Sequence, residues 1–128
     1  MTRPLTKGAG KLLLALVILG SSLSLADEQV GSADAVRFDV QIEHRKVVGD
    51  PVIRLTEEQE VRIVWTTDEA AELHIHGYDI RIDISPDAPA EISFTAYATG
   101  RFAVTSHGFG GDHGHGHETL LYIEVYPK

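Results

Sequence analysis

The segment Val36–Glu43 (VRFDVQIE) decides the fold class of this 128-residue chain. Its apolar residues, Val36, Phe38, Val40 and Ile42, alternate with polar ones. Alternation with a period of two residues is typical of a β-strand that has one face buried and the other in water. The segment therefore predicts a half-buried strand, and such a strand needs partners elsewhere in the chain.

Similar short strand signals recur to the end of the sequence. They lie at residues 52–55, 61–66, 72–76, 78–84, 90–97, 101–107 and 120–126. A turn rich in proline, residues 85–89 (SPDAP), interrupts them, because proline cannot sit inside a sheet. About eight short strands at spacings of about 8–12 residues, without a convincing helix, predict an all-β fold. We expect a β-sandwich or barrel over residues 36–128.

The start of the chain has the composition of a secretory signal peptide. Residues 1–11 carry three basic residues and no acidic one, residues 12–19 (LLLALVIL) are apolar, and small residues precede position 27. This order is that of an export signal, and a membrane-spanning helix would need roughly 20 apolar residues. We expect cleavage after Ala26 and a periplasmic location, with residues 27–35 as a flexible leader. A retained N-terminal anchor is the alternative.

Charge and cysteine content limit the partners of the exported chain. The formal net charge is −8, and removal of three basic residues with the signal peptide makes it −11. An anionic surface attracts cations and repels nucleic acid. We therefore expect a metal ion or a basic periplasmic protein as partner, no nucleic acid, and no membrane span after cleavage. The chain has no cysteine, so it forms no disulfide.

Histidines are the main functional lead. Six of the seven lie between positions 74 and 117: His74, His76, His107, His113, His115 and His117. Neutral imidazole is the commonest metal ligand in proteins. Without thiolate, a metal must be held by nitrogen and oxygen, which favours copper(II) and leaves zinc or nickel open.

The spacing of these histidines suggests how they could meet. In the predicted strand 72–76, His74 and His76 share one face, with Cβ atoms about 7 Å apart, while Leu73 and Ile75 face the core. His107 ends another predicted strand, and the rings converge if the two strands are neighbours. Residues 111–118 (GDHGHGHE) form a histidine-rich tract of the kind that binds metals. Exposed histidines without a ligand role are the alternative for both groups.

Other conspicuous residues have simpler explanations. His44 is expected to be a plain surface residue. Trp65, Phe94, Phe102 and Tyr122 stand in strand phase and are expected in the core. We find no nucleophile with its base, no phosphate-binding loop and no carboxylate pair that indicates an enzyme, so no catalytic residue is assigned.

Three stretches resemble a bacterial cupredoxin-like domain: residues 72–79 (ELHIHGYD), Gly100–His107 (GRFAVTSH) and residues 120–127 (LLYIEVYP). The resemblance covers residues 36–127 and implies a Greek-key β-sandwich with a copper site near one end. His76 matches the histidine that the family places at the end of a middle strand. The cysteine of blue-copper members falls on Ser106 here, and no methionine follows. We therefore expect no blue-copper electron transfer.

Our leading hypothesis is copper(II) handling through a histidine-only site. His74, His76 and His107 would bind the ion, and His113, His115 and His117 would assist or act as a loading arm. Because protons compete for imidazole, metal release should begin as the pH falls through roughly 6.5. A metal-free interaction module and an oxidase or dismutase with an open copper position are the alternatives.

Overall fold

The computed structural model describes residue 2, residues 34–109 and residues 117–128. The expected signal peptide, its cleavage point at Ala26, most of the leader, His113 and His115 lie outside the described residues. Nine strands occur in the described part of the chain. They are β1 (Val36–Glu43), β2 (Lys46–Val47), β3 (Val52–Thr56), β4 (Glu60–Thr67), β5 (Ala71–Ile75), β6 (Ile80–Ile84), β7 (Ala90–Thr95), β8 (Gly100–His107) and β9 (Glu118–Tyr126).

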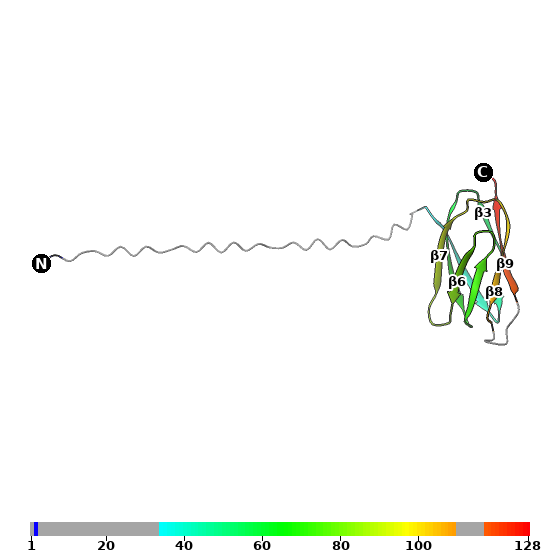
Figure 1. Ribbon diagram of the computed structural model, residues 1–128, viewed down its shortest axis with the longest axis horizontal. Helices are drawn as coiled ribbons and strands as arrows, with labels where there is room; N and C mark the ends of the chain where they lie inside the picture. The colour runs from blue at the N-terminus through cyan, green and yellow to red at the C-terminus, as the bar shows by residue number, and fades with distance from the viewer. Residues whose placement is uncertain (1, 3–33, 110–116) are drawn as a thin grey trace.

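The strands form two sheets that pack as a sandwich (Figure 1). One sheet has the order β2-β1-β4-β7, and the other has the order β3-β9-β8-β5-β6. The pairs β1/β4 and β3/β9 are parallel, and the remaining neighbours are antiparallel. The expected all-β sandwich is confirmed, with one more strand than the sequence analysis found.

The core lies between the sheets and follows the predicted alternation. Ile42 of β1, Leu73 and Ile75 of β5, and Ile123 of β9 are fully buried. Trp65 is fully buried as expected, whereas the other three predicted core aromatic residues, Phe94, Phe102 and Tyr122, are partly buried. Burial of one face of each strand supplies the main stabilisation, at about 25 cal/mol per Å² of apolar surface.

Two local predictions were wrong. The sequence analysis missed β2, which pairs with the end of β1 across a two-residue turn, His44-Arg45. The expected strands 72–76 and 78–84, separated by Gly77, were also too long at that point, because residues 76–79 form the turn between β5 and β6. His76 therefore lies at the start of this turn, although its backbone N–H still donates to the Ala103 carbonyl of β8 at 3.0 Å.

Close packing explains the turn at residues 76–79. Gly77 has φ +82°, and a Cβ atom there would lie 2.3 Å from Cδ1 of Phe102. Next to it, Tyr78 is buried, and its hydroxyl donates a hydrogen bond to the Ala98 carbonyl at 2.8 Å. The Tyr78 ring also packs against Phe102 with a centroid distance of 5.0 Å. These contacts hold the turn of residues 76–79 against the core.

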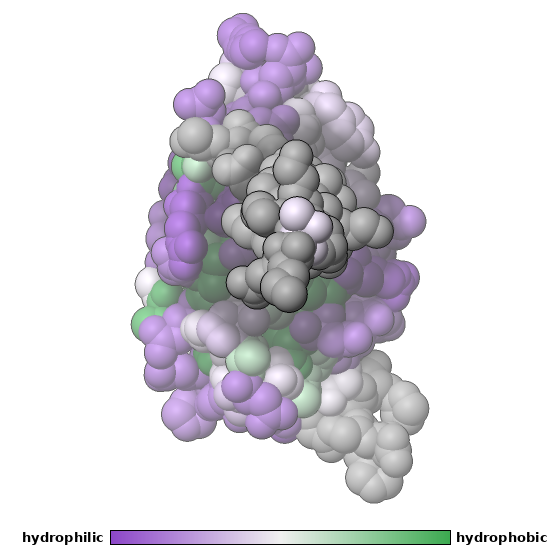
Figure 2. Space-filling model, turned by 90° about the vertical axis from the view of Figure 1, so that its left-hand side faces the viewer, coloured by the Kyte–Doolittle hydropathy of each residue, from purple (hydrophilic) through white to green (hydrophobic). Residues whose placement is uncertain are grey.

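The outer surface is mainly hydrophilic. Figure 2 views the molecule from the left-hand side of Figure 1, where β7 lies. It shows hydrophilic side chains around a smaller hydrophobic area. The edge strands β6 and β7 carry partly buried apolar residues that pack against the core, among them Ile82 and Ile92. In the part of the chain that the structure describes, no helix has the length and apolar character needed to cross a membrane.

Candidate metal-binding face

The candidate ligands lie on the outer face of the five-stranded sheet. Strand β5 pairs with β8 so that Glu72 faces His107 and His74 faces Thr105. Leu73 and Ile75 are fully buried, so the alternating side chains of His74 and His76 point outward as predicted. The two strands are neighbours in the sheet, which is the condition that the sequence analysis set for these rings to approach one another.

His74 and His76 form one close pair. Their ring centroids are 4.2 Å apart, with the rings tilted by 43°. Each ring has its own further partner: Nε2 of His74 lies 3.0 Å from Oδ1 of Asp79, and Nε2 of His76 lies 2.9 Å from Oγ1 of Thr105. The Asp79 side chain is 89% exposed, whereas that of His74 is 14% exposed. The pair is therefore fixed by hydrogen bonds on two sides.

His107 and His117 form the second close pair. His107 ends β8, and His117 directly precedes β9, so the two strands bring them together across the intervening loop. The ring centroids are 4.2 Å apart and the rings are nearly perpendicular, at 89°. Nδ1 of His117 lies 3.3 Å from Nε2 of His107. Two nitrogens bound tetrahedrally to one ion at about 2.0 Å would lie about 3.3 Å apart, which matches this pair.

The surroundings of His107 favour its neutral form. Partial burial lowers the pKa of this imidazole, and repulsion from a protonated His117 lowers it further. Glu72 opposes this effect, while Arg81 and His74 add smaller repulsive contributions. A lowered pKa leaves the ring nitrogens of His107 available to a metal at lower pH.

The four described candidate histidines do not meet at one point. His76 lies opposite Ala103, four residues before His107 on β8, a separation of about 13 Å along the strand. His74 lies between them, diagonally across from His107. Among the described residues, no three histidine, aspartate or glutamate side chains are placed to hold one ion. The six-residue ligand set remains a prediction, because His113 and His115 lie outside the described residues.

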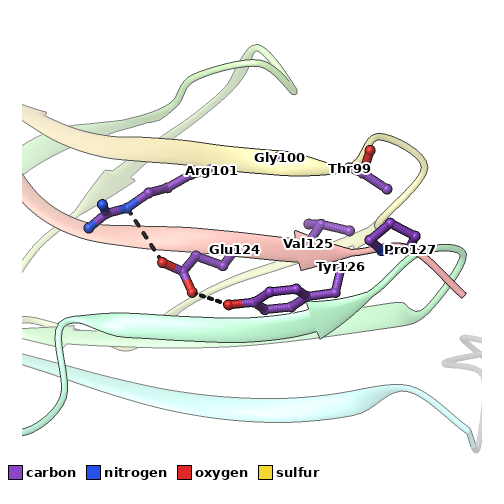
Figure 3. Close-up of a pocket in the computed structure, with 7 residues that line it drawn as sticks. All are labelled: Thr99, Gly100, Arg101, Glu124, Val125, Tyr126 and Pro127. Carbon is purple, nitrogen blue, oxygen red and sulfur yellow. Dashed lines mark hydrogen bonds and ion pairs between the residues drawn. The ribbon is translucent and has the colours of Figure 1, made fainter.

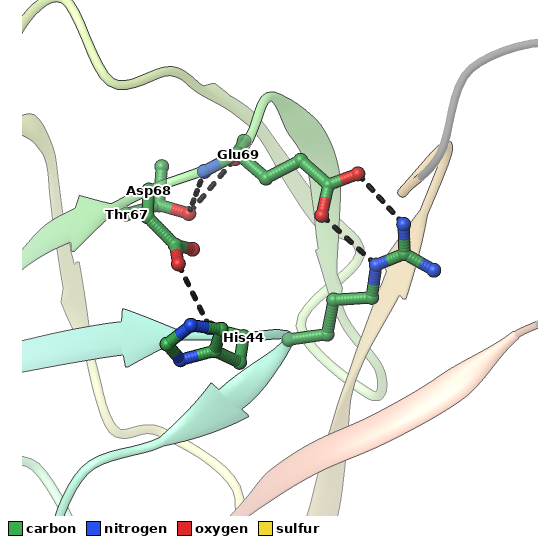
Figure 4. A network of polar contacts seen from close by, with 5 residues as sticks. His44, Thr67, Asp68 and Glu69 are labelled. Atoms are coloured by element: carbon green, nitrogen blue, oxygen red, sulfur yellow. Dashed lines mark hydrogen bonds and ion pairs between the residues drawn. The ribbon is translucent and has the colours of Figure 1, made fainter.

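A network of polar contacts joins the β1–β2 turn to the loop between β4 and β5 (Figure 4). The Arg45 guanidinium makes two hydrogen bonds of 2.9 Å to the Glu69 carboxylate, and its Cζ lies 6.0 Å from the centre of the Phe109 ring. The backbone N–H of His44 donates to Asp68 at 2.9 Å. The His44 side chain is exposed, as predicted. These contacts connect the β1–β2 turn with the β4–β5 loop and the residues that follow β8.

A shallow pocket lies where β8 begins and β9 ends, away from His107 (Figure 3). Its volume is about 400 Å³, and its polar side chains are those of Thr99, Arg101, Glu124 and Tyr126. The Tyr126 hydroxyl donates to Glu124 at 2.7 Å, and Arg101 lies 3.5 Å from the same carboxylate. Because its charged groups and the Tyr126 hydroxyl bond to one another, this pocket offers no better candidate site than the histidine pairs.

Sequence reasoning missed Asp79 and Thr105, the partners of the first pair. Asp79 was placed inside a strand, where it would have no special relation to His74. The signal that could have found it is Gly77, because a turn centred on residues 77 and 78 brings position 79 beside position 76. Thr105 could be found only by knowing the register between β5 and β8.

Comparison with solved structures supports a cupredoxin-like fold. The chain superimposes on a chain of a heme-copper terminal oxidase dimer with a TM-score of 0.58 and 21% identity, covering 73% of this chain and 66% of that one. It is also similar to the periplasmic domain of subunit II of cytochrome oxidase (CoxB) of Bradyrhizobium japonicum. That match has a TM-score of 0.55 and 15% identity, and it covers 73% of this chain and 85% of that one. A match to a copper binding protein in the apo form has a TM-score of 0.50 and 12% identity, and it covers 70% of this chain and 88% of that one.

These likenesses show the fold alone, because all three identities are low. This chain spans 66% of the oxidase chain, slightly under two thirds of its length. No protein-family model matches the sequence, and a search of curated proteins also gives no match. The similarity to these solved structures confirms the expected cupredoxin-like β-sandwich. The chain contains no cysteine.

Proposed function

We propose that this chain is an exported metal-binding protein that handles copper(II) through histidines, without blue-copper electron transfer. The observation that carries the proposal is the approach of His107 and His117, whose nearest ring nitrogens are 3.3 Å apart. Two imidazoles at this distance need little rearrangement to bind one ion. His113 and His115, which lie between them in the sequence, are proposed to supply further nitrogens.

Ligand chemistry supports copper(II) over the other divalent ions. Nitrogen-only sites follow the affinity order in which copper(II) exceeds nickel and zinc. Ser106 occupies the position of the family's cysteine; its side chain is buried, with Oγ 3.4 Å from the Glu118 carbonyl oxygen. A hydroxyl is a poor ligand for soft copper(I), so the proposed role is buffering, delivery or sensing of the oxidised ion. Zinc and nickel are the alternative ions.

The proposed location is the periplasm, where the signal-like residues 1–26 would direct the chain. Similarity to a cytochrome oxidase domain described as periplasmic supports the same location. The net charge of −8 favours attraction of cations, and also of a basic protein partner.

Copper(II) titration of the purified, untagged protein tests this proposal. We expect binding at pH 7.5 and release by pH 5, because protons displace the metal from imidazole. Replacing both His107 and His117 by alanine should weaken binding by about tenfold or more, or about 1.4 kcal/mol per factor of ten. His44→Ala, on the β1–β2 turn, is the matched control and should leave the affinity unchanged.

Two results would count against the proposal. Equal copper retention at pH 7.5 and pH 5 would mean that imidazoles are not the ligands. Protein that binds no copper(II) at either pH would favour the other candidate function, a metal-free interaction module with the same fold.

A further inference from the structure

The first histidine pair faces away from the second. Asp79 follows the C-terminal end of β5, whereas His107 faces Glu72 near the N-terminal end of that strand. Nε2 of His74 points to Asp79, at 3.0 Å. His74 therefore directs its outer nitrogen away from His107 and toward the turn of residues 76–79.

Asp79 adds a carboxylate to this pair. In the turn between β5 and β6, positions 76 and 79 flank the two central residues, so their backbones lie close together, and the Asp79 carboxylate contacts His74, the ring partner of His76. Asp79 has φ +54°, a left-handed conformation that costs free energy in most residues and is tolerated by aspartate. Strained backbone of this kind often occurs at functional sites.

We propose that His74, His76 and Asp79 form a second site for a divalent transition-metal ion, separate from the pair His107 and His117. This inference rests on the proposed metal-binding function and extends it to two ions per chain. Two imidazoles and a carboxylate suit ions that accept both nitrogen and oxygen, and zinc(II) is the probe that best matches this set.

The nearby charges permit a cation at this site. Arg81 faces His74 across the β5/β6 ladder, and its guanidinium bonds to Glu72 at 2.9 Å. The positive charge of Arg81 is thus partly balanced on the same face of the sheet. The Asp79 carboxylate stays largely exposed, so an ion can reach it from solvent.

The present hydrogen bonds set the expected affinity. As they stand, the three side chains are not placed to hold one ion together, so they must rearrange to bind it. An ion that both rings bind through Nε2 must replace the contact between His74 and Asp79 and draw His76 away from Thr105. Each hydrogen bond that is lost weakens binding by up to about tenfold. We therefore expect the second site to fill after the first.

Zinc(II) titration of the full chain, followed by NMR of the histidine ring signals, tests the second site. We expect the His74 and His76 signals to respond, with an affinity at least about tenfold weaker in Asp79→Asn. The matched control is Asp83→Asn, which also removes one negative charge. Asp83 lies on β6 opposite Glu72. The response should be unchanged in that control and in the double variant His107→Gln/His117→Gln.

The other outcomes separate this inference from the proposed function. If His74 and His76 do not respond, or if the Asp79 and Asp83 variants behave alike, the second site is wrong. If the His74 and His76 response disappears in the His107/His117 double variant, all four rings serve one shared site, and the second site is again wrong. If His74 and His76 respond while His107 and His117 do not, the second site stands and the proposed role of the other pair fails.

Discussion

The turn at residues 76–79 and the loop ends at His107 and His117 hold similar histidine pairs in different ways. In both pairs the ring centroids are 4.2 Å apart. The first pair lies beside a turn whose Gly77 and Tyr78 pack on Phe102, and its rings also bond to Asp79 and Thr105. At the second pair, the two rings contact each other, and the surrounding loops are connected by exposed ion pairs.

This difference matters because the two kinds of support contribute unequally to stability. Close packing against the core is worth several kcal/mol, whereas an exposed ion pair such as that between Arg45 and Glu69 is worth about 0–1 kcal/mol. We therefore expect the β5–β6 turn to be rigid and the His107 end to adjust more easily. A site that adjusts can close around an ion at low cost, whereas a site beside a rigid turn must give up contacts that it already makes.

The largest expected effect comes from adding a methyl group at the glycine of each region. Gly77→Ala should destabilise the protein by about 2–4 kcal/mol, since it combines steric overlap with Phe102 and a left-handed backbone. Gly108→Ala, with φ +84° and no atom within 4 Å of the added Cβ, should lose only about 1–2 kcal/mol. Denaturant unfolding measures both values. Equal losses would mean that the two regions are supported alike.

The second prediction concerns the hydroxyl group beneath the rigid turn. Tyr78 donates to the Ala98 carbonyl at 2.8 Å and accepts from the Ala98 N–H at 3.2 Å. Tyr78→Phe leaves both backbone groups without this partner, so we expect a loss of about 1–2 kcal/mol. Thermal or chemical unfolding at neutral pH checks this value.

The same variant should also change the stability profile at alkaline pH. Burial raises the pKa of Tyr78 in the folded protein. Because the unfolded side chain ionises more easily, this group stabilises the fold fully below about pH 10 and loses that contribution as the pH rises further. The fall in unfolding free energy above pH 10 should therefore be shallower in Tyr78→Phe. Identical slopes in the two proteins would contradict a buried, neutral Tyr78.

Most of the fold could be predicted from the sequence, because a strand with one buried face has alternating apolar and polar residues. Val36–Glu43 was assigned with its observed bounds, and the outward direction of His74 and His76 followed from the buried Leu73 and Ile75. The parallel pairing of β1 with β4 was not predictable in this way. Periodicity states which face of a strand is buried and carries no information about its neighbour.

The candidate site was less predictable for two physical reasons. Tyr78 is in phase with Ile80 and Ile82, so the alternation hid the turn, and with it the contact between Asp79 and His74. The distance between His107 and His117 depends on how β8 and β9 pair, across a bulge between Val104 and Thr105. The sequence showed which side chains could bind a metal, while strand register determined which of them met.

The smallest predicted effect tests whether His117 changes the pKa of His107. The pKa of His107 is lowered, first by burial and then by repulsion from a protonated His117. A lowered pKa means that the neutral ring stabilises the fold above about pH 6.5 and that this contribution is lost as the pH falls below it. His117→Gln removes the repulsion, so the NMR titration midpoint of His107 should move upward. His44→Gln, on the β1–β2 turn, should leave that midpoint in place. An unchanged midpoint in His117→Gln would show that repulsion from His117 does not perturb His107, and that the two rings do not interact closely enough in solution to share an ion.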